Sequence, residues 1–253
     1  SGDYWHEMEY DVDSSAITAN VAGRYLQTRY DIVTHVMRPI LQSFLLPFHN
    51  LKSLHGALVS NGDRTLMLTG SGGAGKTTTA IRLAMSGWDL LSDDAPFFLF
   101  DDGRAVALSS LDYAHLTGDT LRLFPELCAN VVGEPDLREK VPVSSRAFRS
   151  GDEWRKARPV THVIELKRTT VGSPRLVSVD RATATAAMLG EMMVVFRPEV
   201  IRADRARFAR YSALIFDIIS ALMQNAAILR LEFADRHLED LPALLAGPVL
   251  DRC

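Results

Sequence analysis

The chain has 253 residues, of which 47 % are hydrophobic and 23 % are charged, a composition typical of an ordinary folded globular protein. A formal net charge of −3 indicates no bulk attraction to nucleic acid or to an anionic membrane. No run approaches about 18 consecutive apolar residues, no signal-peptide pattern is present, and two cysteines without metal-ligand spacing fit a reducing cytosol. We therefore expect a cytoplasmic protein whose partners include neither nucleic acid nor a membrane.

The first 50 residues are expected to form an N-terminal extension that packs a helix on the rest of the chain. Asp31 could cap this helix, because apolar residues recur at helical spacing over residues 32–45. Pro39 predicts a kink or break inside that run, and Pro47 ends it. Residues 51–253 are then expected to form one larger domain.

Two hairpin signals lie at the start of this larger domain. The apolar segments 54–60 and 65–69 are separated by Asn61-Gly62-Asp63, which predicts two antiparallel strands joined by a tight turn. The same pattern recurs over residues 97–108, with the turn at residues 101–103. Many nucleotide-binding proteins have a mainly parallel sheet, whereas these hairpins favour a mixed sheet.

Residues 70–77 lie between the two hairpins and match the phosphate-binding loop pattern G-x-x-x-x-G-K-[ST] in full. The glycines allow positive φ angles, so that backbone N–H groups can approach phosphate oxygens. Lys76 can reach the β- and γ-phosphates of ATP, the Thr77 hydroxyl can ligate Mg²⁺, and a helix is predicted from Lys76 to about Gly87. The expected nucleotide-binding residues are Gly70, Ser71, Gly72, Gly73, Ala74, Gly75, Lys76, Thr77 and Thr78.

Paired carboxylates follow one helix and one return strand later, at Asp93 and Asp94. Phosphoryl transfer needs a metal ligand beyond Thr77 and a group that accepts the proton of the acceptor hydroxyl. One acid could therefore bind the Mg²⁺ shell while its neighbour serves as the base, and adjacent carboxylates raise one another's pKa. The alternative is that both are turn or capping residues before Pro96.

His55 lies in the strand that precedes the first hairpin. A histidine there could orient a phosphate or tune the neighbouring carboxylates, or it could be a structural residue of the strand.

The rest of the chain is less informative. Residues 109–160 carry proline, glycine and charge with little periodicity, which predicts loops and short helices. Strands are predicted at 161–166, 175–179 and 228–233, and helices at 181–193, 204–224 and 238–245.

Two basic groups could contact an anion or could be solvated surface. Arg138 and Lys140 lie in a polar loop that could close over the γ-phosphate. A second cluster could receive an acidic peptide or a phosphate, and consists of Arg197, Arg202, Arg205, Arg207 and Arg210.

The segments 55–59, 70–77 and 90–94, in this order and at these spacings, resemble the catalytic domain of HPr kinase/phosphorylase. This family consists of bacterial serine kinases whose fold is similar to the nucleotide core of phosphoenolpyruvate carboxykinase. The resemblance covers roughly residues 54–108. It implies an α/β fold with a mixed β-sheet P-loop core and flanking helices.

On the matching positions the resemblance also implies roles for single residues. Asp93 would be the base for the acceptor hydroxyl, Asp94 would support the metal together with Thr77, and His55 would lie beside the base. The implied catalytic residues are thus Asp93, Lys76 and His55.

The chain departs from the family pattern at residues 164–168, where the nearest match to a later signature with Glu and Arg lacks its glycines. It looks closer to divergent HPr-kinase-like proteins, some of which modify ribosomal precursor peptides such as lasso-peptide precursors. The expected function is an ATP- and Mg²⁺-dependent kinase that transfers the γ-phosphoryl group to a Ser or Thr hydroxyl of a protein or peptide. Family analogy also suggests a homo-oligomer.

Two alternatives to this function remain. One is a small-molecule hydroxyl kinase on the same fold. The other is an ATP-binding regulatory switch with little catalysis, which would not need paired acids positioned for an acceptor.

Overall fold

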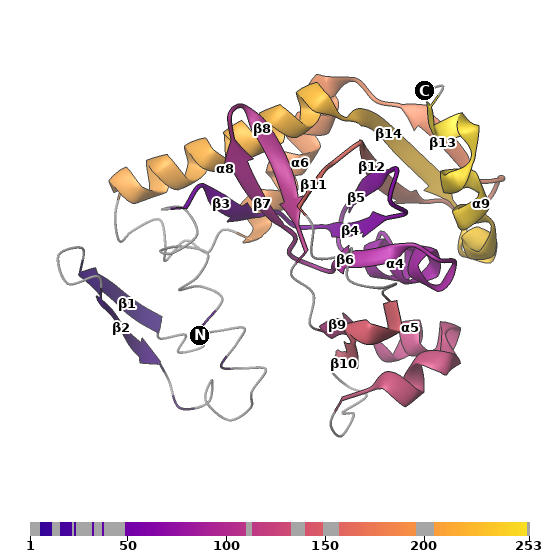
Figure 1. The fold of residues 1–253 in the computed structure, drawn as a ribbon, viewed down its shortest axis with the longest axis horizontal. Helices are drawn as coiled ribbons and strands as arrows, with labels where there is room; N and C mark the ends of the chain where they lie inside the picture. Colours follow the sequence, from indigo (N-terminus) through magenta and orange to yellow (C-terminus); the bar gives the residue numbers. More distant parts are fainter. Residues whose placement is uncertain are drawn as a thin grey trace.

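The protein is represented by a computed structural model, shown as a ribbon in Figure 1. The structure describes residues 6–11, 16–21, 23, 32, 37, 49–109, 113–132, 140–148, 157–195 and 205–251. The helix expected in the N-terminal extension and its cap Asp31 fall outside the described residues, apart from residues 32 and 37. The expected division into residues 1–50 and 51–253 therefore remains a prediction.

A six-stranded mixed sheet forms the centre of the molecule, in the order β13-β14-β12-β5-β4-β6. Strand β12 is parallel to β5 and to β14, and the other neighbours are antiparallel, which confirms the predicted mixed sheet. The strands are β4 (Ala57–Ser60), β5 (Thr65–Thr69), β6 (Asp89–Ser92), β12 (His162–Arg168), β13 (Arg175–Ser178) and β14 (Ala227–Phe233).

Side chains of this sheet alternate between two hydrophobic clusters, as the period-2 geometry of strands requires. Leu66 and Leu68 of β5 belong to the cluster that includes residues of helix α4, whereas Met67 packs with residues of helices α6 and α8. Helix α4 therefore covers one face of the sheet, and α6 and α8 cover the other (Figure 1). The helices are α4 (Lys76–Met85), α5 (Gly118–Leu123), α6 (Arg181–Val195), α8 (Arg205–Asn225) and α9 (Leu241–Ala246).

The second predicted hairpin exists, but it lies outside the six-stranded sheet. Strands β7 (Phe97–Asp101) and β8 (Arg104–Leu108) pair within a four-stranded sheet of order β11-β8-β7-β3. Asp94 has a left-handed φ of 70°, so the chain turns sharply after β6 and leaves the first sheet. The remaining strands of the four-stranded sheet are β3 (Leu51–Ser53) and β11 (Arg158–Pro159).

Residues 109–160 contain strands that the sequence did not predict. Strands β9 (Tyr113–Leu116) and β10 (Val141–Ser144) form a separate antiparallel pair, and their inward side chains join the cluster that contains α4. Each strand has only four residues and β10 contains Pro142, so neither gives a clear alternating pattern. The predicted short helices are present as α5 and the 3₁₀ segments η4 (Pro125–Asn130) and η5 (Ser145–Phe148).

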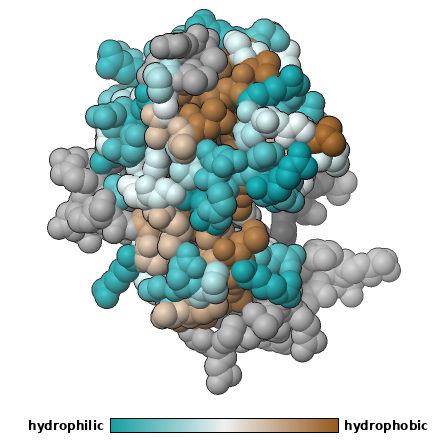
Figure 2. Space-filling model, turned by 90° about the vertical axis from the view of Figure 1, so that its right-hand side faces the viewer, coloured by the Kyte–Doolittle hydropathy of each residue, from teal (hydrophilic) through white to brown (hydrophobic). Residues whose placement is uncertain are grey.

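The remaining described elements lie at the two ends of the chain. Strands β1 (His6–Asp11) and β2 (Ala16–Val21) form an antiparallel hairpin. The 3₁₀ segments η7 (Asp235–Asp240) and η8 (Pro248–Asp251) flank α9. On the side of the molecule at the right of Figure 1, hydrophilic residues surround smaller groups of hydrophobic ones (Figure 2). Among the described residues, no helix combines the length and the apolar character needed to cross a membrane.

Candidate functional site

Several predicted site residues meet at one edge of the six-stranded sheet. Strands β5, β6, β12 and β14 point the same way, because β4 is antiparallel to both β5 and β6. The residues that follow these four strands therefore emerge at the same edge, where ligands bind in many open α/β sheets. His55 is also at this edge because it precedes β4, which starts there. The order of strands brings together the phosphate loop, the paired acids and His55.

The phosphate loop has the backbone conformation that its glycines permit. Gly70, Gly73 and Gly75 have φ angles of 131°, 80° and 96°, which disfavour residues with a side chain. A Cβ atom at Gly70 would also lie 2.8 Å from the carbonyl oxygen of Leu166. Helix α4 begins at Lys76, immediately after Gly75, so the predicted start of the helix is confirmed. The unpaired N–H groups of its first turn can thus face an anion.

Lys76 folds back over the loop. Its Nζ donates hydrogen bonds to the carbonyl oxygens of Gly70, at 2.5 Å, and of Ser71, at 3.1 Å. Burial lowers the pKa of Lys76, while the negative charges of Glu191, Asp94 and Asp93 raise it. The ammonium group therefore lies among carbonyl and carboxylate oxygens at the loop, from which it can turn to phosphate oxygens.

Asp93 contacts the hydroxyl group that is expected to ligate Mg²⁺. Thr77 Oγ1 donates a hydrogen bond to Asp93 Oδ1 at 2.8 Å. The other carboxylate oxygen, Oδ2, is buried, and a backbone hydrogen bond from His115 also acts on the carboxylate and lowers its pKa. Burial raises the pKa of Asp93 to about 6, the nearby charge of Asp94 raises it further, and the hydrogen bond from Thr77 opposes this shift. A carboxylate with this pKa is suited to accept a proton near neutral pH.

The raised pKa of Asp93 has a measurable consequence for stability. The folded pKa of about 6 exceeds the usual 3.8, so the folded protein loses stability as pH rises through this interval and remains less stable above it. Asp93→Asn removes this ionisation. In the absence of metal, we therefore expect the Tm of the variant minus that of the wild type to be roughly 5–10 °C greater at pH 8 than at pH 4. Thermal unfolding in EDTA at both pH values measures this. An equal Tm difference at the two pH values would contradict the assigned pKa.

Asp94 and His55 form a second contact at the same edge. The ring Nδ1 of His55 lies 3.1 Å from the backbone oxygen of Asp94 and 3.5 Å from its Oδ1. The N–H of Gly56 donates to the same backbone oxygen at 3.2 Å, which ties the start of β4 to the turn after β6. His55 was expected beside the base Asp93, and the structure places its ring against Asp94, the residue next to that base.

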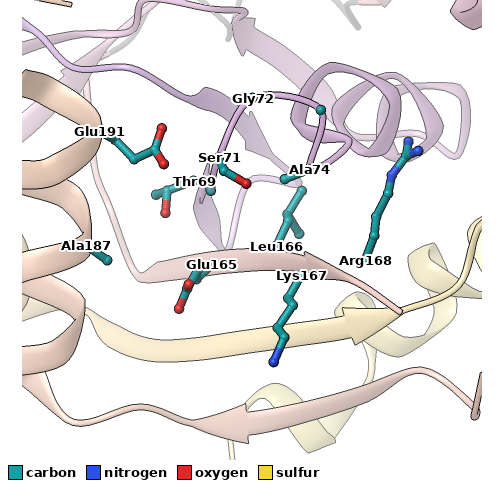
Figure 3. A pocket seen from close by; sticks show the side chains of 12 residues that line it. Thr69, Ser71, Gly72, Ala74, Glu165, Leu166, Lys167, Arg168, Ala187 and Glu191 are labelled. Atoms are coloured by element: carbon teal, nitrogen blue, oxygen red, sulfur yellow. The ribbon is translucent and has the colours of Figure 1, made fainter. Parts of the chain in front are cut away.

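A cavity of about 330 Å³ lies between the loop, the end of β12 and helix α6 (Figure 3). Glu191 extends from α6 toward the loop residues Thr69 and Ser71, and Arg168 lies at the α4 end. The sequence did not indicate these two residues as site residues. Their approach depends on the parallel pairing of β12 with β5 and on the packing of α6, neither of which a local pattern shows. The cavity is lined by Thr69, Gly70, Ser71, Gly72, Gly73, Ala74, Glu165, Leu166, Lys167, Arg168, Ala187 and Glu191.

The two predicted basic groups are only partly described. Lys140 is exposed, and its positive charge lowers the pKa of both Lys76 and Asp93, so this residue lies near the site. Arg138 is outside the described residues, as are Arg197 and Arg202. The other members of the arginine cluster lie in the first part of α8.

The chemistry of these residues fits Mg²⁺ and ATP. No group of three or more His, Cys, Asp or Glu side chains among the described residues could hold a metal by itself. Mg²⁺ in nucleotide sites is usually held by one or two protein groups, waters and phosphate oxygens. The Thr77 hydroxyl and the carboxylates of Asp93 and Asp94 supply such groups beside a loop shaped for phosphates.

Part of the chain is similar in sequence to a protein of known function. No protein-family model matches the chain. The HPr kinase/phosphorylase of Lactobacillus delbrueckii subsp. bulgaricus is 34 % identical over 76 residues, which are 30 % of this chain and 24 % of that protein. The chain thus matches about a quarter of the relative's length.

The chain also superposes weakly on a solved structure of a protein with a similar name. The HPr(Ser) kinase/phosphatase from Coxiella burnetii has 12 % sequence identity and a TM-score of 0.35, over 79 % of this chain and 88 % of that chain. This TM-score is too low to support a conclusion, so the similarity to HPr kinase/phosphorylase depends on the sequence match alone.

Proposed function

We propose that this chain, as an HPr kinase-like protein, is an ATP- and Mg²⁺-dependent kinase that phosphorylates a Ser or Thr hydroxyl of a protein or peptide. The observation that carries the proposal is the contact between Thr77 and Asp93 beside the phosphate loop. This contact places Thr77, a candidate metal ligand, against Asp93, a carboxylate with a pKa of about 6. Both residues lie beside Lys76, the lysine of the loop.

The proposed reaction assigns one task to each residue. The loop amides and Lys76 bind the phosphates and stabilise the charge that develops on the transferred group. Asp93 accepts the proton of the acceptor hydroxyl, whose oxygen forms a bond to the γ-phosphorus while the bond to the β–γ bridging oxygen breaks and ADP leaves. Mg²⁺, held by Thr77 and Asp94, would neutralise charge on the β- and γ-phosphates.

Two observations on Asp93 point to different roles for this residue. The raised pKa of Asp93 supports its role as base. Its hydrogen bond to Thr77 would equally suit a residue of the metal shell. Measuring nucleotide binding, Mg²⁺ affinity and transfer separately in variants of each acid distinguishes these roles.

His55 is proposed to hold Asp94 in place. Because the charge of Asp94 raises the pKa of Asp93, loss of the ring changes the ionisation of the base. His55→Ala is therefore expected to change the pH dependence of kcat. The profile is measured from about pH 5 to 9, with His237→Ala as a control, since that ring pairs with Asp240 instead. An unchanged profile in His55→Ala would leave His55 a purely structural residue.

The proposed acceptor is a protein or peptide and the proposed location is the cytoplasm, where the two-cysteine composition fits a reducing environment. A homo-oligomer is proposed only by analogy with the family. Nucleic acid and membranes are not proposed as partners, because the net charge is −3.

The test is incubation of the protein with γ-³²P-ATP, Mg²⁺ and a lysate of the source organism, alongside the Asp93→Asn variant. A labelled protein or peptide that is absent with the variant would support the proposal and deliver the acceptor for identification. Release of phosphate without a labelled macromolecule would favour a small-molecule kinase. Bound ATP that is never turned over would favour a regulatory switch.

A further inference from the structure

Arg168, at the end of β12, lies against the point where helix α4 begins. A Cβ atom placed on Gly75, the residue before the helix, would lie 3.2 Å from both Nε and Nη2 of Arg168. The guanidinium group therefore occupies the space that the glycine leaves free. We propose that Arg168 is a phosphate-binding residue of the nucleotide site, an inference that rests on the proposed function and adds a residue to it.

The orientation of the guanidinium group leaves one edge available. Its Nη1 donates a hydrogen bond to Asp235 Oδ2 at 3.2 Å, just beyond β14. Within the described part of the chain, its Nε and Nη2 donate to no acceptor, and these two atoms are the ones nearest Gly75. Two parallel N–H groups on one edge match two oxygens of a phosphate group. Asp235 thus acts as a positioning residue that fixes the donor edge toward the loop.

The residues around Arg168 direct its side chain toward the phosphate loop. Alternation along β12 directs Arg168 toward the α4 end of the site, whereas the Lys167 side chain points the opposite way (Figure 3). Lys167 instead pairs with Glu232 at 3.4 Å. Phe233 lies beside the same space, because its Cζ would be 3.6 Å from a Cβ atom on Gly75, and it limits the freedom of the guanidinium group.

Charge is then divided across the loop in a way that suits a polyphosphate. Asp93 follows β6 on one side of β5, and Arg168 ends β12 on the other side. On the side of Asp93, the carboxylates would bind the metal and accept the proton of the acceptor hydroxyl. On the other side, Arg168 supplies a positive charge at the N-terminus of helix α4, where an anion binds. Arg168 is therefore expected to contribute to binding of ADP as well as ATP, because its contact does not require the transferred phosphate.

The test measures binding without turnover, by isothermal titration calorimetry of Mg²⁺-ADP and of inorganic pyrophosphate. Arg168→Gln is expected to raise the Kd of both ligands by about 10- to 100-fold, the usual effect of losing hydrogen bonds to a charged group. The matched control is Arg175→Gln, which removes an arginine whose guanidinium pairs with Glu232. Its Kd values are expected to stay within about twofold of the wild type.

Two further variants isolate the role of the guanidinium group. Arg168→Lys keeps the charge but loses the two-donor edge, so its Kd should lie between the wild-type and Arg168→Gln values. Asp235→Asn keeps Arg168 but removes the carboxylate that orients it, and a smaller rise in Kd is expected. If Arg168→Gln does not fold, these two variants carry the test, and wild-type Kd values in both would overturn the proposal.

Other outcomes separate this proposal from the proposed function. A folded Arg168→Gln variant that binds both ligands as tightly as the wild type would overturn the role of Arg168 and leave the kinase proposal intact. A loss of ADP affinity with unchanged pyrophosphate affinity would also overturn it, because the contact would then be with the nucleoside. A wild-type protein that binds neither ligand would overturn both.

Discussion

Lys76→Ala is expected to abolish phosphoryl transfer, with a loss of about 10³-fold or more in kcat, and to weaken ATP binding. The reason is the position of the ammonium group, which hydrogen-bonds the carbonyls of Gly70 and Ser71 and so lies directly on the loop. No shorter side chain can carry a positive charge from the start of α4 to the phosphates. Single-turnover rates with γ-³²P-ATP and calorimetric Kd values measure the two effects.

A matched control makes this result specific. Arg122→Ala also removes one positive charge, but this side chain is exposed and pairs with Asp119 in α5, so turnover should match the wild type. If Lys76→Ala both bound ATP and turned it over as the wild type does, the assignment of residues 70–77 as the catalytic phosphate loop would be wrong. Weak binding with normal turnover at saturating ATP would limit Lys76 to ground-state binding.

Parts of the site could be predicted because their signals are local. The phosphate loop is a contiguous motif, and its strand and helix adjoin it directly in the chain. Asp93 returns after one helix and one short strand, so its approach to Thr77 follows from the shortest connection. The hairpin around Gly62 gave the antiparallel neighbour of β5, and with it the place of His55 at the same edge.

The residues that the sequence did not indicate depend on distant pairing. Strand β12 pairs with β5 although nearly a hundred residues separate them in the chain, and only this pairing brings Arg168 to the loop. Glu191 reaches the loop because α6 packs on the sheet face opposite α4. Hydrophobic periodicity predicts that such elements exist, but it does not specify which neighbours they choose. The detail that His55 contacts Asp94 likewise follows from the left-handed turn at Asp94.

Asp93→Asn is expected to keep nucleotide binding and to lower the transfer rate by about 10²-fold or more, since an amide cannot accept the proton of the acceptor hydroxyl. The substitution preserves the size of the side chain, and an amide oxygen can still accept the hydrogen bond from Thr77, so the loop should remain intact. Calorimetry with Mg²⁺-ADP and single-turnover transfer to the identified acceptor measure the two quantities. Wild-type transfer in this variant would remove Asp93 from the role of base.

Asp94→Asn is the matched control, because it changes the neighbouring acid in the same way. It is expected to raise the Mg²⁺ concentration needed for half-maximal rate, and to lower the pKa of Asp93 by removing a negative charge that raises it. If Asp93→Asn instead weakened Mg²⁺ binding and left the transfer step intact at saturating metal, the two acids would have exchanged roles. The hydrogen bond between Thr77 and Asp93 would then be the mark of a metal site, and Asp94, held by His55, would be the base.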